Sequence, residues 1–359
     1  MDSPHPLNVP LPLRPHPIAV IGAGGIVRDA HLPAYRLAGF PVALLHDLDA
    51  ARARRLAADF GVPLTCPTLA AAVAAAPKPT IFDVAVPASA LPAVLAALPD
   101  GAAVLMQKPF GENLAQAREL LALCRQKSLC AAVNFQLRFA PCIAAARALI
   151  AQGAIGDLHD LEVRVTVDMP WHLWTFLEGI PRMEILYHSI HYVDLIRSFL
   201  GEPRGVHART VKHPRTQRLA STRTNIALDY GDTLRANITT NHGHAFGRLH
   251  QESYVKWEGT RGALKAKLGL LLDYPRGEPD TLDLCQLDAD GRAGPWQPVP
   301  IGGNWYPHAF IGPMAGLQRF ASGEATELPT RVDDAIRTMA VVEAAYQSNE
   351  QGGTPIPSA

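Results

Sequence analysis

The first part of the chain alternates short apolar runs with longer amphipathic stretches. We expect strands at the apolar runs 18–21, 42–45, 81–86, 104–106 and 131–133. The segments between them, such as 50–60 and 114–127, are rich in Ala, Leu and Arg and have the composition of helices. Strands that alternate with helices form a parallel sheet with both faces covered. The pattern therefore predicts an α/β domain over residues 18–140.

The pattern changes after Gly153. Strand-like runs joined by short turns follow at 158–168, 204–211, 224–230, 233–240 and 250–258, and helices are expected at 183–200, 308–322 and 332–348. The sequence Tyr230-Gly231-Asp232-Thr233 is typical of a hairpin turn. We therefore predict a second, α+β domain over residues 141–359 with a mostly antiparallel sheet, whose C-terminal helices can pack back on the first domain. Residues 1–17 are Pro-rich and are expected to be a flexible leader, not a secretory signal.

Composition narrows the class of protein. The 359 residues are 48% hydrophobic and 18% charged, which suits two folded domains. Lys and Arg number 33, as do Asp and Glu, so the chain lacks the positive field that nucleic-acid or acidic-membrane binding requires. No stretch approaches the roughly 20 apolar residues of a membrane span. Five scattered cysteines without metal-site spacing favour reduced thiols in a cytoplasmic protein.

A glycine-rich turn follows the first predicted strand. In the sequence from Ile18 to Val27, Gly22 permits a tight turn and Gly24 allows a pyrophosphate to approach the backbone closely. The helix that follows presents free N–H groups to phosphates. Val27 stands where Gly or Ala is usual, so the prediction of a dinucleotide site depends on the strand–turn–helix context.

Asp47 ends the second predicted strand, where an acidic residue accepts a hydrogen bond from a ribose 2′-hydroxyl. A carboxylate there repels a 2′-phosphate, so NAD is favoured and NADP remains possible, since His46 and Arg52 are close in sequence. The alternative is that Asp47 only caps the next helix.

Lys108 follows the buried run 102–106, at the carboxyl end of a predicted central strand. Ligands of open α/β sheets bind at that edge. A lysine there can donate to a substrate oxygen, and burial would lower its pKa towards neutrality. A solvated surface lysine is the alternative.

The helix expected at 183–200 carries five polar or ionisable residues, Glu184, Tyr187, His188, His191 and Asp194. Spacings of three and four place much of this set on one helical face. His191 suits the role of general base towards an alcohol, and a core histidine is the alternative. Glu184, His188 and His191 could bind zinc, but no further ligand motif supports this, so we expect no metal.

Two more segments combine aromatic rings with hydrogen-bonding groups. The first contains Trp171, His172 and Trp174, and the second contains Trp305 and His308. Apolar rings beside a few polar groups suit polyhydroxylated ring substrates. Packing in a core or interface is the alternative for each.

The order of motifs resembles the glucose–fructose oxidoreductase/inositol dehydrogenase/rhizopine-catabolism (Gfo/Idh/MocA) family. The resemblance covers residues 18 to about 352. Its motifs are Gly22-x-Gly24-Gly25-Ile26, His31-Leu32-Pro33-Ala34-Tyr35, Gln107-Lys108-Pro109, Asn134 to Pro141, Gln152 to Gly156, Ile190-His191-Tyr192-Val193-Asp194-Leu195, Glu258 to Gly262 and Glu343 to Ser348.

The resemblance implies an NAD(P)-binding Rossmann domain and a second domain with a large open sheet that forms homodimer or homotetramer contacts. It implies oxidation or reduction of a CH–OH group of a sugar, inositol or related cyclic polyol, with His191 as general base and Lys108 polarising the reacting oxygen. Cofactor contacts are implied for Gly22, Gly24, Gly25, Ile26, Asp47, Pro87, Gln107 and Lys108. We assign substrate contacts to Lys108, Trp171, His172, Trp174, His188, His191, Trp305 and His308.

The chain departs from the family pattern at three positions. Gln107 replaces the usual Glu, Tyr187 replaces the Asp four residues before the helix histidine, and the segment beginning at Pro87 lacks the family's His. Tyr187 or His188 would then take over the role of the lost carboxylate. These departures also keep two alternatives open: an NAD-dependent sensor without catalysis, and a hydrolase or lyase that uses bound NAD transiently.

Overall fold

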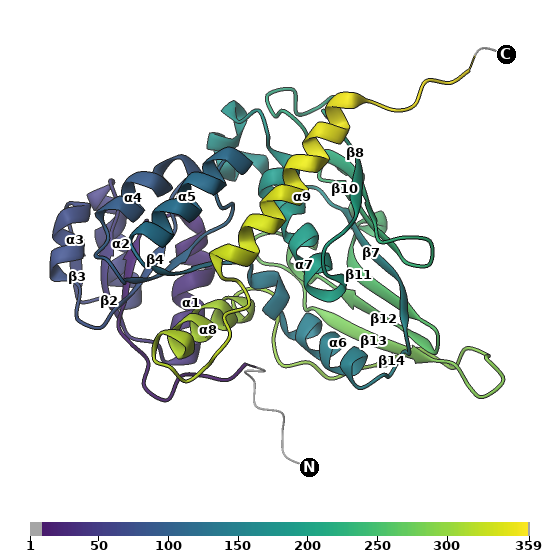
Figure 1. The fold of residues 1–359 in the computed structure, drawn as a ribbon, viewed down its shortest axis with the longest axis horizontal. Helices are drawn as coiled ribbons and strands as arrows, with labels where there is room; N and C mark the ends of the chain where they lie inside the picture. Colours follow the sequence, from purple (N-terminus) through teal and green to yellow (C-terminus); the bar gives the residue numbers. More distant parts are fainter. Residues whose placement is uncertain (1–8, 358–359) are drawn as a thin grey trace. The chain divides into compact units, whose positions relative to one another are not determined.

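The computed structural model describes residues 9–357, and its chain divides into two units. Among these residues, unit 1 contains 9–144 and 302–339, and unit 2 contains 145–301 and 340–357. Two helices, α6 (Pro141–Ala151) and α9 (Val332–Gln351), each begin in unit 1 and end in unit 2 (Figure 1). The sequence predicted a first domain over residues 18–140 on which the C-terminal helices can pack back, and unit 1 also takes in residues 302–339 near the end of the chain.

Unit 1 is built on a six-stranded parallel sheet with the strand order β3-β2-β1-β4-β5-β6. Its strands β2, β3 and β4 are labelled in Figure 1. The strands are β1 (Ile18–Ile21), β2 (Val42–His46), β3 (Leu64–Cys66), β4 (Ile81–Val84), β5 (Ala103–Met106) and β6 (Cys130–Val133). Every residue of β1, β4 and β5 is buried, as a sheet covered on both faces requires. The order reverses between β1 and β4, and ligands of such sheets bind in the crevice that this reversal opens at the carboxyl ends.

Helical segments between and after these strands complete unit 1. They are η1 (Val27–His31), α1 (Leu32–Ala38), α2 (Ala50–Phe60), α3 (Leu69–Ala75), η2 (Ala88–Ala90), α4 (Leu91–Ala97), α5 (Leu114–Gln126), η3 (Gln136–Phe139), η8 (His308–Phe310) and α8 (Ile311–Ala321). Although α8 is distant in sequence, it contacts β5 and β6. Its Met314 and Leu317 belong to the same apolar cluster as Leu105 and Ala132.

Part of the expected flexible leader has fixed partners. The backbone N–H of Leu13 donates to Glu324 at 3.0 Å, and that of His16 donates to Gln318 at 2.8 Å. Residues 9–17 therefore lie along unit 1, and the rest of the expected leader, residues 1–8, lies outside the described residues.

Unit 2 is built on an eight-stranded sheet with the order β14-β13-β12-β11-β7-β10-β9-β8. Its strands are β7 (Leu158–Thr166), β8 (Gly205–Val211), β9 (Arg223–Asp229), β10 (Arg235–Asn241), β11 (Glu252–Gly259), β12 (Gly262–Lys267), β13 (Thr281–Gln286) and β14 (Gln297–Pro298). Among the described strands of this sheet, only β7 and β10 pair in parallel. The prediction of a mostly antiparallel sheet is confirmed, and so is the hairpin between β9 and β10, where Asp229 pairs with Arg235.

The helical segments of unit 2 are η4 (Trp171–Gly179), η5 (Ile185–Ser189), α7 (Ile190–Leu200), η6 (Arg248–His250) and η7 (Gly269–Leu272). Helix α7 packs on β10. Strand β7 shows the two faces of the sheet, because Leu161, Val163 and Val165 are fully buried while the residues between them are polar. On the polar face, Arg164 pairs with Glu252 and Arg235 pairs with Asp160, both at 2.6 Å.

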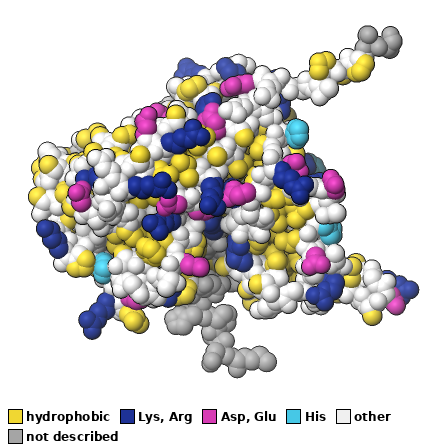
Figure 2. Space-filling view, viewed as in Figure 1, with side chains coloured by type: hydrophobic (Ala, Val, Ile, Leu, Met, Phe, Trp, Pro, Cys, Tyr) yellow, Lys and Arg dark blue, Asp and Glu magenta, His cyan; other side chains and the backbone are white. Residues whose placement is uncertain are grey.

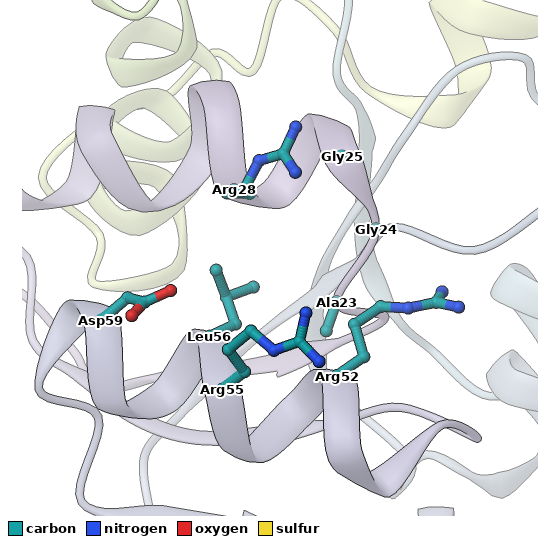
Figure 3. A pocket seen from close by; sticks show the side chains of 8 residues that line it. All are labelled: Ala23, Gly24, Gly25, Arg28, Arg52, Arg55, Leu56 and Asp59. Carbon is teal, nitrogen blue, oxygen red and sulfur yellow. The ribbon is translucent and has the colours of Figure 1, made fainter. Parts of the chain in front are cut away.

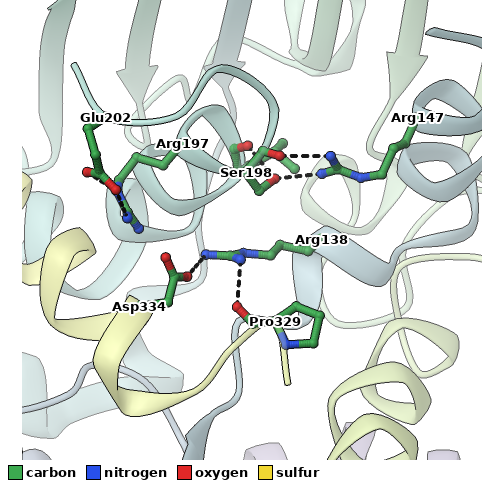
Figure 4. A network of polar contacts seen from close by, with 8 residues as sticks. Arg138, Arg147, Arg197, Ser198, Glu202, Pro329 and Asp334 are labelled. Atoms are coloured by element: carbon green, nitrogen blue, oxygen red, sulfur yellow. Dashed lines mark hydrogen bonds and ion pairs between the residues drawn. The ribbon is translucent and has the colours of Figure 1, made fainter. Parts of the chain in front are cut away.

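Arginines fix segment ends within each unit (Figure 4). In unit 1, Arg138 of η3 donates to the Pro329 carbonyl at 3.0 Å and to Asp334 at 2.6 Å. In unit 2, Arg147 of α6 donates to the carbonyl of Ser198 at 2.8 Å and to its hydroxyl at 2.6 Å.

Basic and acidic side chains are interspersed on the face seen in Figure 2, with no large field of one sign. Within residues 9–357, no helix is long and apolar enough to cross a membrane.

Candidate functional site

The glycine turn after β1 is shaped for a close ligand. Gly22 has a φ of +104°, and a Cβ there would lie 2.3 Å from the Ala85 carbonyl oxygen, so only glycine fits. A Cβ on Gly24 would meet nothing within 4 Å, and Gly25 is exposed. The half-buried Ile26 leads into η1. The open backbone at Gly24 and Gly25 fits the approach of a pyrophosphate.

Asp47 holds the glycine turn with one of its oxygens. Its Oδ2 accepts from the N–H of Ala23 at 2.7 Å, and its Oδ1 accepts from the N–H of Asp49 at 2.8 Å. The cap of α2 is Asp49, which accepts from the N–H groups of Ala51 and Arg52. Because a carboxylate offers about four acceptor positions, Asp47 retains capacity for a ribose hydroxyl.

A pocket of about 270 Å³ lies between the glycine turn and α2 (Figure 3). Its lining includes three arginines: Arg52 and Arg55 from α2, and Arg28 from η1. Of these three, only Arg52 was expected from the sequence near this site, although Arg55 lies three residues further on and on the same helical face. Guanidinium groups attract phosphate, whereas Asp47 repels it, so this pocket bears on the choice between NAD and NADP.

Lys108 and Gln107 follow the end of β5. The N–H of Gln107 donates to the Val84 carbonyl of β4 at 2.8 Å, and its buried side chain accepts from the N–H of Lys108 at 2.8 Å. Lys108 is partly buried, and desolvation by burial lowers the pKa of its ammonium group to about 8. Pro87 is exposed where β4 gives way to η2. The sequence placed Lys108 correctly at the carboxyl end of a buried strand.

Trp305 and His308 belong to unit 1, just before and at the start of η8. Trp305 is only 3% exposed, which agrees with the packing alternative for this residue. His308 is half-buried, its Nδ1 accepts from the Asn304 N–H at 3.3 Å, and burial lowers the pKa of its ring. A role for either residue in substrate binding remains a prediction.

The helix of unit 2 that carries Tyr187, His188 and His191 is not regular. Residues Ile185–Ser189 form a π-helix, and the α-helix begins only at Ile190. The expected face with spacings of three and four is therefore wrong across this segment, because a π-turn contains an extra residue and shifts the side chains before it. His191 is 8% exposed, while Tyr187 and His188 are half-buried.

Glu184, at the start of this segment, is fully buried and has its own partners. It accepts hydrogen bonds from Ser189 and Thr240 at 2.9 Å, and His242 Nε2 lies 3.2 Å from the same oxygen. Burial raises the pKa of the Glu184 carboxyl, but hydrogen bonds and the charge of His242 outweigh it and hold that pKa below its ordinary value. Within the described part of the chain, no group of three or more His, Cys, Asp or Glu side chains could hold a metal ion.

Aromatic rings gather beside this helix in unit 2. Trp171 contacts the rings of His188, His242 and Trp174 at centroid distances of 5.4, 5.9 and 6.3 Å. Trp174 contacts Tyr274 at 4.9 Å, and His172 is exposed. His242 and Tyr274 could not be found from the sequence, because no local spacing relates them to Trp171 or to the helix.

Comparison with known proteins identifies the two domains of the chain. Residues 17–135 match the model of an oxidoreductase family with an NAD-binding Rossmann fold, and residues 143–265 match the Gfo/Idh/MocA C-terminal domain. The chain is similar to a D-apiose dehydrogenase from Paraburkholderia graminis, with 26% identity over 356 residues, 94% of this chain and 88% of that protein.

Two solved structures share the fold. One is an oxidoreductase from Agrobacterium radiobacter in complex with NAD+, L-tartaric acid and magnesium, with a TM-score of 0.76, 21% identity, and coverage of 95% of this chain and 98% of that one. The other is a dehydrogenase from Bordetella pertussis in complex with NADH and UDP-GlcNAcA, with a TM-score of 0.71, 18% identity, and coverage of 96% and 100%. Because the two family models together match more than half of the chain, this protein belongs to the Gfo/Idh/MocA family of oxidoreductases and contains its NAD-binding Rossmann domain.

Proposed function

We propose that this protein is an NAD(P)-dependent dehydrogenase or reductase that acts on a CH–OH group of a sugar, inositol or related cyclic polyol. The observation that carries the proposal is the partly buried Lys108 at the carboxyl end of β5, whose pKa burial lowers to about 8. A desolvated ammonium group at that edge of a Rossmann sheet suits proton donation to a substrate oxygen. The similarity to a D-apiose dehydrogenase supports sugars as the substrate class.

In the proposed mechanism, the residues of this chain manage the proton and orient the substrate. Lys108 donates a hydrogen bond to the reacting oxygen and stabilises its developing negative charge, and His191 accepts the hydroxyl proton. Tyr187 stands where the family has a carboxylate and assists this proton transfer. When bound, the nicotinamide supplies the hydride acceptor. Gly22, Gly24, Gly25, Ile26, Asp47, Pro87 and Gln107 would hold the cofactor.

The first experiment identifies the substrate and the preferred cofactor. A thermal-shift screen with NAD, NADP and a panel of sugars, inositols and aryl diols identifies ligands, because binding to the folded state raises its apparent stability. Turnover of the hits is then followed by NADH or NADPH absorbance. The screen includes NADP because the arginines around the 270 Å³ pocket attract phosphate, whereas Asp47 favours NAD.

Lys108→Ala and His191→Ala should each lower kcat/KM by about 10²–10⁴-fold. If the two side chains act on one oxygen, the double variant should lose little more than the worse single variant. Lys78→Ala, at an exposed lysine, is the matched control and should retain full activity. Near-full turnover by both single variants would contradict the mechanism.

A sensor that binds NAD without turnover is the second candidate, favoured by Gln107 and Tyr187 in place of the family's carboxylates. It predicts tight NAD binding with no absorbance change across the whole substrate panel. A hydrolase or lyase would instead yield product without net NADH.

We also propose that the chain assembles as a homodimer or homotetramer through the polar face of the unit 2 sheet, and that it acts in the cytoplasm. The ion pairs of Arg164 with Glu252 and of Arg235 with Asp160 give this face the polar surface that a self-complementary contact can use. The five free cysteines suit a reducing compartment.

A further inference from the structure

A buried histidine links the end of η1, the helix that follows the glycine turn, to the segment that carries Lys108, entirely within unit 1. His31 is the last residue of η1 and has no solvent exposure. Its Nδ1 lies 2.7 Å from the Asp83 Oδ2 of β4, which also accepts from the Tyr35 hydroxyl at 2.9 Å. Asp83 is itself fully buried within the sheet. One side of the His31 ring is therefore held by a carboxylate.

The other side of the ring contacts two amides. The side-chain nitrogens of Gln107 and Asn134 each lie 3.4 Å from His31 Nε2. The oxygen of Gln107 accepts from the backbone N–H of Lys108 at 2.8 Å. Since a backbone N–H can only donate, this bond fixes which end of the Gln107 amide faces Lys108, and the NH2 end must face His31.

This orientation determines the protons on His31. An amide NH2 group only donates, so Nε2 of His31 must accept and carry no proton. The ring proton then lies on Nδ1 and is donated to Asp83. In each contact from Asp83 through His31 and Gln107 to the main chain of Lys108, one donor therefore faces one acceptor.

We propose that His31 is a positioning residue that fixes the backbone at Lys108 through Gln107. The proposal rests on the proposed function, because it gives Lys108 its catalytic role. An ionised glutamate at position 107 could not donate to His31. In this chain, Gln107 donates to one ring nitrogen of His31 and Asp83 accepts from the other, so both residues match the same neutral ring. The end of η1 and the backbone at Lys108 are thereby joined through a single buried ring and the Gln107 amide.

Two substitutions of His31 separate positioning from mere packing. In His31→Gln, the side-chain oxygen reaches towards the former Nε2 and can still accept from Gln107. In His31→Asn, the shorter amide can donate to Asp83 as Nδ1 does, but leaves Gln107 without its acceptor. Both variants remove the same ring and its contact with Phe310, whose centroid lies 5.0 Å away.

The readout is the reactivity of Lys108 in the full-length protein, with and without saturating NAD. Trace acetic anhydride labels lysines competitively, and mass spectrometry reports the labelling of Lys108 relative to the exposed Lys78 across pH. His31→Asn should change this ratio by at least about threefold, the effect of a half-unit pKa shift. His31→Gln should stay close to wild type. Equal changes in the two variants, or none in His31→Asn, would overturn the proposal.

A second pair keeps the test decisive if a His31 variant fails to fold. Gln107→Leu removes the link to Lys108, while Asn134→Leu removes a buried amide on the same ring nitrogen but leaves the link intact. Only Gln107→Leu should alter Lys108 labelling. Side-chain ¹⁵N spectra of the histidines should also show His31 protonated on Nδ1 alone, and protonation on Nε2 would contradict the arrangement. None of these measurements needs a substrate, so their failure is distinct from a failure of the proposed activity.

Discussion

A methyl group should lower the stability of the fold at Gly22 and the affinity for NAD at Gly24. At Gly22 it meets a carbonyl oxygen at 2.3 Å and the φ of +104° is unfavourable, so Gly22→Ala should destabilise the fold by at least about 1–3 kcal/mol. At Gly24 a Cβ meets nothing within 4 Å, so Gly24→Ala should fold normally. It should nevertheless weaken NAD binding, because the methyl group occupies the approach to the turn. Thermal unfolding and NAD titration by calorimetry measure the two effects, and a Gly24→Ala variant that binds NAD like wild type would contradict the assignment.

Lys108 should cost the protein stability at neutral pH. Its pKa is about 8 in the folded state against 10.5 ordinarily, so below about pH 8 the fold bears the full cost of burying an ammonium group. Between these values the unfolded chain binds the extra proton, so wild-type stability should rise with pH. Lys108→Met should therefore be more stable than wild type at pH 7, with the difference shrinking towards pH 10.5. Urea unfolding at a series of pH values tests this, and Lys78→Met should show no such trend.

The sequence predicts the positions of single residues where the signal is local. Gly22, Asp47 and Lys108 follow directly from their positions at strand ends. His31 and Asp83 lie far apart in sequence and meet only when η1 packs on β4, so no spacing predicts their contact. The same holds for Glu184 and His242, which join the helix segment to the residue after β10.

At the scale of elements, the buried Glu184 ties η5 to the end of β10. His242→Ala should destabilise unit 2 by about 3–5 kcal/mol, since it removes a partner from a buried carboxylate. His242→Gln can retain a donor and should cost less. The folded pKa of Glu184 lies below its ordinary 4.5, so its ionised form stabilises the fold above that pH and this contribution is lost as pH falls further.

Urea midpoints at pH 7 measure the effect of the two His242 substitutions. The His242→Ala variant should also lose less stability than wild type on acidification, because its carboxyl group protonates more readily. A midpoint for His242→Ala equal to that of wild type would show that the pair contributes nothing.

Many strands and helices with a clear period were predicted, although β12, which also alternates, and β13 were not among the expected strands. The runs at β1, β2, β4, β5 and β6 and the helices α2 and α5 are confirmed within a few residues. Strand β3 has three residues and β14 has two, too few for alternation to register. The π-helix η5 escaped prediction because its apolar pattern also fits an α-helix, and tertiary contacts decide which forms.

At the scale of the whole molecule, assembly through the unit 2 sheet can be tested at its centre. Asn237 lies on the polar face of β10, between Glu162 of β7 and Ala227 of β9. Asn237→Trp should disrupt a contact between copies of this face and reduce the sedimentation mass to the 38.7 kDa of one chain. Glu119→Trp, at an exposed position on α5, should leave the mass unchanged. An unaltered mass for Asn237→Trp would place the interface elsewhere.

The late segment of unit 1 has a consequence for biosynthesis. All six strands of the first sheet have been made once residue 133 is complete, but α8, which contacts β5 and β6, spans Ile311–Ala321. A growing chain must therefore carry uncovered apolar surface on those strands until the ribosome has translated nearly all of unit 2. We expect a fragment that stops at residue 301 to aggregate or recruit chaperones, whereas the same cut would be harmless in a protein whose nucleotide domain closes on its own first half.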